Sequence, residues 1–73
     1  MPGGNEAFNQ LPPRLTAVLA MVAGGRTNRD ISEELCVTIH TAEKYVSEIL
    51  ARAHCRTRAE LISTYWQEIL AEH

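Results

Sequence analysis

Apolar residues recur at helical spacing in separate segments of the chain. In an early segment they follow the i, i+3, i+4, i+7 pattern of one buried stripe, at Leu15, Val18, Leu19 and Val22. In a later segment they lie within about 100° of arc at 100° per residue, at Ala42, Val46, Ile49, Leu50 and Ala53. Val, Ile and Tyr are scattered and do not alternate, so the pattern favours helices over sheet. The predicted fold class is all-α.

Proline and glycine bound the first predicted helix. A proline at the first helical position loses no needed hydrogen-bond donor, and its φ already suits a helix, so Pro13 is a helix start. Gly24-Gly25 supplies a left-handed stop. The first helix is therefore predicted over residues 13–23.

Threonines followed three residues later by an acid predict the starts of two further helices. Thr27 with Asp30 resembles a capping box with the shorter acid. Thr57 with Glu60 makes a full capping box, in which each residue satisfies a free N–H group of the other. These signals predict helices over residues 28–35 and 58–71.

Thr38 can cap another helix, predicted over residues 38–53. Only Cys36 and Val37 separate it from the preceding helix, as expected of a helix-turn-helix. Opposite its apolar stripe stand polar residues, namely His40, Glu43, Lys44 and Ser47. A DNA major groove admits one helix, and side chains of its first turns reach the bases. Any solvated helix presents such a face, so the face alone does not decide between DNA contact and solvent.

The order of the motifs resembles the LuxR/GerE-type helix-turn-helix family. The matching pieces are Pro-Arg (13–14), Val-Leu (18–19), Ala-x-Gly (23–25), Thr-Asn-Arg-Asp-Ile (27–31), Leu35, Val37-Thr38, Thr41, Ile49-Leu50 and Thr-Arg-Ala-Glu-Leu (57–61). Their spacing fits without a gap, and the combination is specific although each piece alone is weak. The resemblance implies a four-helix domain, of the winged-helix-like class without a wing, over residues 11–73.

The resemblance further implies a transcription regulator that binds double-stranded DNA as a homodimer. Its phosphate contacts fall on Thr27 and Asn28, and its third helix reads the groove. The DNA-binding positions implied are Thr27, Asn28, Thr38, His40, Thr41, Glu43, Lys44, Tyr45 and Ser47. The family domain often follows a receiver or ligand-sensing domain in a longer chain, although some members stand alone.

The fourth predicted helix is apolar over about 180° of arc, wider than one small core requires. The dimer interface is therefore expected on this helix, at Leu61, Ile62, Tyr65, Trp66 and Ile69. The alternative is that Trp66 and Ile69 fold back over the first helix. A membrane-surface helix is disfavoured, because the charged residues are acidic and anionic lipid attracts Lys and Arg.

The sequence departs from the family pattern at several positions. Glu43 stands where a lysine is common, and its carboxylate could accept a hydrogen bond from a cytosine amine. Tyr45 replaces a frequent histidine, Ala42 a valine and Ala17 a glutamate. His54 occupies the glycine position that ends the third helix, and histidine enters the left-handed region more readily than most residues.

Charge qualifies the DNA-binding hypothesis. The 73-residue chain has a net charge of −2, whereas DNA affinity comes largely from Lys and Arg. From Thr38 to Arg58, however, the sequence contains four basic residues and only two acidic ones, and no Lys or Arg follows Arg58. The alternative function is a helix-turn-helix fold that has lost DNA binding and serves as a protein-interaction module, as Glu43 and Glu48 would suggest.

Other classes of protein are disfavoured. No apolar run approaches the roughly 20 residues of a membrane span, and no signal peptide precedes the domain, so a cytoplasmic protein is expected. Residues 1–10 are interpreted as a flexible leader. No nucleophile, base and orienting acid form a recognisable motif, so neither an enzyme nor a cofactor is expected.

A shared zinc site is the remaining alternative. Cys36, His40, His54 and Cys55 have suitable ligand chemistry, but a helix over residues 38–53 would hold the two pairs about 24 Å apart. Reduced thiols without a metal are therefore expected.

Overall fold

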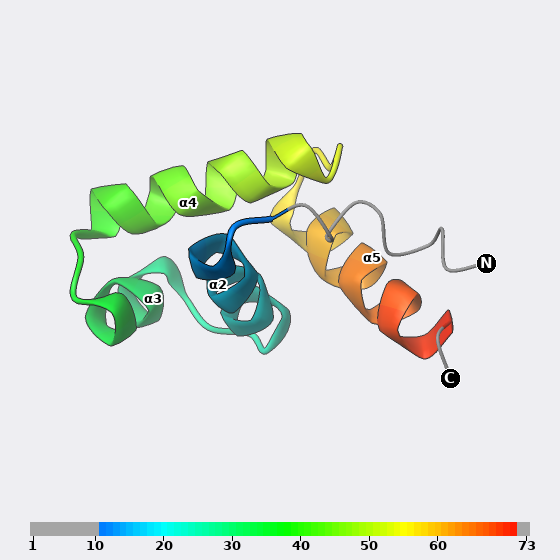
Figure 1. Cartoon of the computed structure of the whole chain (residues 1–73), viewed down its shortest axis with the longest axis horizontal. Coiled ribbons are helices and arrows are strands. Elements are labelled where there is room, and N and C mark those ends of the chain that lie inside the picture. Colours follow the sequence, from blue (N-terminus) through cyan, green and yellow to red (C-terminus); the bar gives the residue numbers. More distant parts are fainter. Residues whose placement is uncertain (1–10, 72–73) are drawn as a thin grey trace.

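The computed structural model describes residues 11–71, and this part of the chain is all-α, as predicted (Figure 1). Its four helices are α2 (Pro13–Ala23), α3 (Asn28–Leu35), α4 (Ile39–Arg52) and α5 (Arg58–Ala71). No strand occurs within residues 11–71. The leader predicted at residues 1–10 lies outside the described residues.

The first helix begins and ends at the predicted signals. Pro13 occupies the first turn of α2. Gly24 keeps a right-handed φ of −83°, and Gly25, with φ +86°, is the residue that adopts the left-handed conformation. The N–H of Arg26 then donates to the Met21 carbonyl at 3.0 Å. The predicted stop therefore resides in Gly25, with Gly24 still continuing the turn.

Thr27 and Thr57 both cap their helices, but only Thr27 forms the complete capping box that was predicted for each of them. The Thr27 hydroxyl accepts from the Asp30 N–H at 3.1 Å, and the Asp30 carboxylate accepts from the Thr27 N–H at 3.0 Å. The Thr57 hydroxyl likewise accepts from the Glu60 N–H at 3.0 Å. The Glu60 carboxylate, however, accepts from the N–H of Arg56 at 2.8 Å, one residue before the predicted partner. The longer glutamate side chain therefore satisfies a donor just outside the box.

The helix-turn-helix consists of α3, a short turn and α4, joined at the left of Figure 1. Cys36 takes a left-handed conformation (φ 58°), and the N–H of Val37 donates to the Ser32 carbonyl at 2.9 Å. This bond closes α3 and turns the chain. Thr38 caps α4 as predicted, so the helix itself starts at Ile39.

The C-terminal end of α4 also falls one residue short of the predicted range, because Ala53 is the cap that follows the helix. His54 has φ 59°. Its N–H donates to the Ala51 carbonyl at 3.3 Å, and the Cys55 N–H donates to the Leu50 carbonyl at 2.9 Å. This pair of bonds is a Schellman motif, the same ending that glycine most often provides.

A single small core holds the helices together. α4 packs against both α2 and α3, and α5 packs against α2. The largest fully buried side chains are Val18, Leu19, Val22, Ile31, Ile49 and Leu61. The predicted stripe of α4 is buried, except that Leu50 is half-buried at its margin. Because α4 packs against two helices, its orientation is fixed and its opposite face remains exposed to solvent.

Candidate nucleic-acid interface

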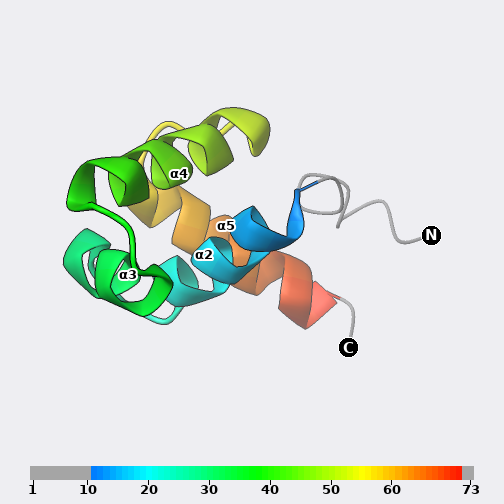
Figure 2. The same cartoon turned by 60° about the vertical axis from the view of Figure 1, so that its left-hand side comes forward.

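The outward face of α4 lies along one edge of the molecule. In Figures 1 and 2 the other three helices all lie on its inner side. All four polar residues of the predicted groove-reading face are exposed, namely His40, Glu43, Lys44 and Ser47. The first half of α4 therefore presents one uncovered polar surface, which we call the α4 face.

Charges on α4 differ in how they are balanced. Within residues 11–71 neither Lys44 nor Glu43 forms an ion pair, so both charges remain available to a ligand. By contrast, Arg52 Nη2 lies 2.9 Å from a Glu48 carboxylate oxygen one turn before it. The uncompensated charges of α4 are thus concentrated in its first half.

Thr38 and Thr41 use their hydroxyl groups on each other. The Thr38 hydroxyl accepts from the Thr41 N–H at 3.1 Å and donates to the Thr41 hydroxyl at 3.0 Å. Thr41 is half-buried, whereas Thr38 is exposed. This pair stabilises the start of α4, and the Thr41 hydroxyl keeps a hydrogen to donate outward.

Tyr45 stands apart from the other predicted contact residues. It is half-buried and packs against the core, and the Arg14 guanidinium carbon of α2 lies 5.9 Å from its ring centroid. This distance is typical of a cation–π contact. Tyr45 therefore ties α4 to α2, and its contact with DNA stays a prediction.

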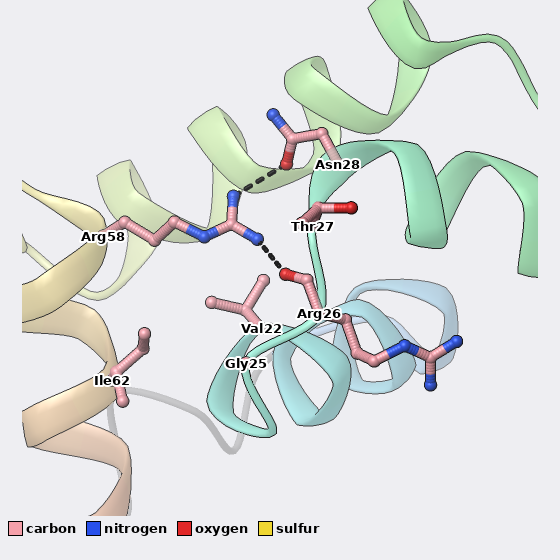
Figure 3. Close-up of a pocket in the computed structure, with 7 residues that line it drawn as sticks. All are labelled: Val22, Gly25, Arg26, Thr27, Asn28, Arg58 and Ile62. Atoms are coloured by element: carbon pink, nitrogen blue, oxygen red, sulfur yellow. Dashed lines mark hydrogen bonds between the residues drawn. The ribbon is translucent and has the colours of Figure 1, made fainter.

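The start of α3 is held by Arg58, a residue for which the sequence predicts no role in a binding site. Arg58 of α5 donates from Nη1 to the Asn28 amide oxygen at 2.7 Å and from Nη2 to the Arg26 carbonyl (Figure 3). These groups line a hollow of about 340 Å³ between α5 and the segment that leads into α3. Thr27 is exposed beside it, and Asn28 is half-buried. No local sequence signal links residues 30 positions apart.

Asp30 is electrostatically adapted to its place in the capping box. The backbone N–H of Thr27 is the main cause that lowers the pKa of its carboxyl group below 3.8, and the Thr27 hydroxyl adds to it. Nearby Arg26 and Arg29 lower this pKa further. The ionised form is thus the one that the start of α3 stabilises.

The outer side of α5 leaves two large apolar side chains accessible. Trp66 is 46% exposed and Leu70 is 69% exposed, whereas Leu61 is fully buried. The Trp66 indole N–H donates to the Ala23 carbonyl at the end of α2, at 3.2 Å. The indole edge therefore folds back over α2, as the alternative for this helix expected, while much of the ring stays accessible.

The described residues offer little to other site types. Cys36 and Cys55 are free thiols. No group of three or more His, Cys, Asp or Glu side chains within residues 11–71 could hold a metal ion. None of the helices in this range has the length and apolar character needed to span a bilayer.

Known proteins resemble this chain over most of its length. Residues 9–65 match the family described as bacterial regulatory proteins, luxR family. The two-component response regulator PprB of Pseudomonas aeruginosa is 40% identical over 57 residues, which cover 78% of this chain and 21% of PprB. The oxygen regulatory protein NreC of Staphylococcus haemolyticus is 31% identical over 58 residues, covering 80% of this chain and 27% of NreC. This chain thus spans about a quarter of the length of these relatives.

Proposed function

Because the chain belongs to the luxR family of bacterial regulatory proteins, we propose that it is a sequence-specific DNA-binding domain of a transcription regulator. The observation that carries the proposal is the α4 face, which is polar and uncovered on a helix whose opposite side is locked into the core. A major groove about 12 Å wide accepts a helix of this kind. The domain would place the first half of α4 in that groove.

The chemistry of the α4 face indicates which bases it would read. Lys44 donates only, so it suits the O6 and N7 acceptors of guanine. Glu43 is an acceptor when ionised and suits the N4 amine of cytosine. His40 and Ser47 flank these charges and can donate or accept. We therefore expect a preference for G·C pairs where Glu43 and Lys44 meet the groove.

Phosphate contacts would orient the domain on the duplex. Thr27 and Asn28 lie at the start of α3, where free N–H groups and the helix dipole favour an anion. Thr38 and Thr41, at the start of α4, would approach the flanking backbone. Contacts of this type set register and orientation without reading sequence.

Dimerisation through α5 completes the proposal. A second copy would cover the accessible surface of Trp66 and Leu70 together with the half-buried Ile62, Tyr65 and Ile69. Leu61, which was also expected at this interface, is fully buried within one copy, so the exposed Leu70 takes its place in the proposed interface. Two recognition helices would then address half-sites about one DNA turn apart on a near-palindromic operator. The much greater length of the relatives supports placing a receiver or ligand-sensing domain in a longer parent chain.

The experiment that tests the proposal is selection of bound duplexes from a random-sequence library, followed by affinity measurements at several salt concentrations. We expect recovered sequences to share a near-palindromic motif, and the affinity to fall steeply with salt. Failure to bind any duplex at low salt would contradict DNA binding and favour the protein-interaction module. The ion pair of Glu48 with Arg52 weakens that alternative, since it neutralises one of the two acids that motivated it.

A pair of variants tests the role of the α4 face. Lys44→Ala should weaken binding to the selected duplex by about 1 to 3 kcal/mol and relax the preference at one base pair. Arg52→Ala is the matched control, because it removes one positive charge from the last turn of the same helix. It should leave base preference unchanged. Equal changes in preference for both variants would contradict base reading by the first turns of α4.

A further inference from the structure

We infer that Arg58 is a positioning residue for DNA binding, which acts by orienting Asn28 and the backbone before α3 toward a phosphate. This inference rests on the proposed function. Arg58 belongs to α5, the proposed dimerisation helix, yet both of its terminal nitrogens bond to the segment that starts α3. The start of α3 is therefore held by a side chain from a distant part of the chain.

The bond to Asn28 determines which end of the amide faces outward. A guanidinium group only donates, so it must meet the oxygen of the amide and not its nitrogen. Figure 3 shows the Asn28 amide nitrogen turned away from Arg58. A phosphate only accepts, so the outward NH₂ group is the end that can bind it. Without Arg58 the amide would be free to turn its oxygen toward the phosphate and repel it.

The second bond holds the chain just before the cap of α3. Arg58 Nη2 donates to the carbonyl of Arg26, the residue that precedes Thr27. This fixes the direction from which the chain enters the capping box of Thr27 and Asp30. The same guanidinium thus sets both the Asn28 side chain and the backbone N–H groups at the start of α3.

A direct phosphate contact by Arg58 is the rival explanation, because a guanidinium carries five donor hydrogens. Salt dependence separates the two roles. Removing a cation that neutralises a phosphate reduces the slope of log affinity against log salt by about 0.9. Removing the contact of a neutral amide lowers affinity without releasing fewer counterions, so the slope stays the same.

The test measures binding of the selected duplex by fluorescence anisotropy across a range of salt concentrations. The single variants are Arg58→Gln, Arg58→Lys and Asn28→Ala, and one double variant combines Arg58→Gln with Asn28→Ala. Arg58→Gln and Asn28→Ala should each weaken binding about fivefold to tenfold, the scale of one hydrogen bond, with unchanged slope. The double variant should lose less than the product of the two single losses, because the part of the effect of Arg58 that passes through Asn28 is already lost in Asn28→Ala and only its bond to the Arg26 carbonyl remains to be removed.

Arg58→Lys keeps the charge but cannot supply a rigid fork to two acceptors, so it should bind as weakly as Arg58→Gln. Full rescue by lysine, a reduced slope, or multiplying losses in the double variant would overturn the inference and leave the proposed function intact. Wild-type protein that binds no duplex would overturn both. Because Arg58→Lys is the milder change, it keeps the test decisive if thermal unfolding shows that Arg58→Gln fails to fold.

Discussion

At the residue scale, the capping box of α3 uses the carboxylate of Asp30, although a neutral glutamine amide can fill the same role in capping boxes. The Asp30 carboxylate accepts the Thr27 N–H, and Arg26 and Arg29 lie close enough to favour its ionised form. Arg26 Nε lies 3.8 Å from the Asp30 carboxylate. The Asp30 side chain therefore caps the start of α3 and also carries the negative charge that the neighbouring arginines stabilise.

This coupling predicts acid sensitivity at the start of α3. The pKa of Asp30 is lowered in the folded protein, so its stabilising effect is fully present above the ordinary value of 3.8 and is lost as pH falls below it. Asp30→Asn should therefore lower the free energy of unfolding at neutral pH, and the difference from wild type should shrink in strong acid. Urea unfolding at a series of pH values measures this. A difference that stays constant across the series would contradict the assignment.

The arginines and the single lysine differ in whether a carboxylate lies close enough to balance their charge. Arg26, Arg29 and Arg52 each lie near a carboxylate on their own or the neighbouring turn. Lys44 has no such partner within residues 11–71. Exposed ion pairs contribute little to stability, so their main effect is to mask charge. Fewer cations than the sequence contains are therefore available to attract the phosphates of DNA.

At the scale of the elements, three helices end in a left-handed residue, and only one of these residues is glycine. Gly25 ends α2, whereas Cys36 and His54 do the same for α3 and α4. A side chain in this conformation costs about 1 to 2 kcal/mol. The chain accepts this cost at Cys36, in the turn between α3 and α4, and at His54, after the end of α4. The family resemblance implies a glycine at the second of these positions.

His54→Gly should accordingly raise the free energy of unfolding by about 1 kcal/mol, or roughly 4 to 8 °C in Tm for a domain of this size. Thermal unfolding followed by circular dichroism measures the shift. Gly25→Ala is the matched control and should lower the free energy of unfolding. No atom beyond its chain neighbours lies within 4 Å of the added methyl group, so only the left-handed backbone is strained. A loss of stability in His54→Gly would show that the imidazole makes a contribution beyond backbone conformation.

Local signals predicted the elements well, because caps and stops act within a few residues of each other. Thr27, Thr38 and Thr57 begin their helices as the sequence indicated. The same periodicity located the α4 face. It could not show that Tyr45 packs toward α2, nor that Arg58 and Trp66 bond to α3 and α2. Those contacts join residues 30 or more positions apart and depend on how the helices cross.

At the scale of the whole molecule, the two proposed contact surfaces lie on different helices. The α4 face forms one edge of the domain, while α5 begins beneath the C-terminal end of α4, away from its first half (Figure 1). α2 lies between them and packs against both. The spacing of two half-sites would therefore be set through α2 as a rigid connector.

Leu70→Glu should strongly weaken the proposed self-association without unfolding the monomer. Leu70 is 69% exposed, so its replacement changes monomer stability by no more than about 0.5 kcal/mol. In a dimer the charge would replace an apolar contact worth about 1.5 to 3 kcal/mol per copy, which raises the dimer Kd by about 100-fold or more. Sedimentation equilibrium measures that constant. Gln67→Glu, which adds the same charge to an exposed position of α5, is the matched control, and equal weakening by both would argue against an interface centred on Leu70.

The hydrogen bond of Trp66 has a practical consequence for such measurements. Trp66 is the only tryptophan of the chain, and its indole is tied to the end of α2 while much of the ring faces outward. Its emission will therefore report two separable events from one chromophore. Covering the exposed ring by a second copy shifts the emission toward shorter wavelengths, whereas breaking the bond to Ala23 on unfolding shifts it the other way. The fluorescence of Trp66 is thus expected to follow unfolding, and also the proposed dimerisation, without an added label.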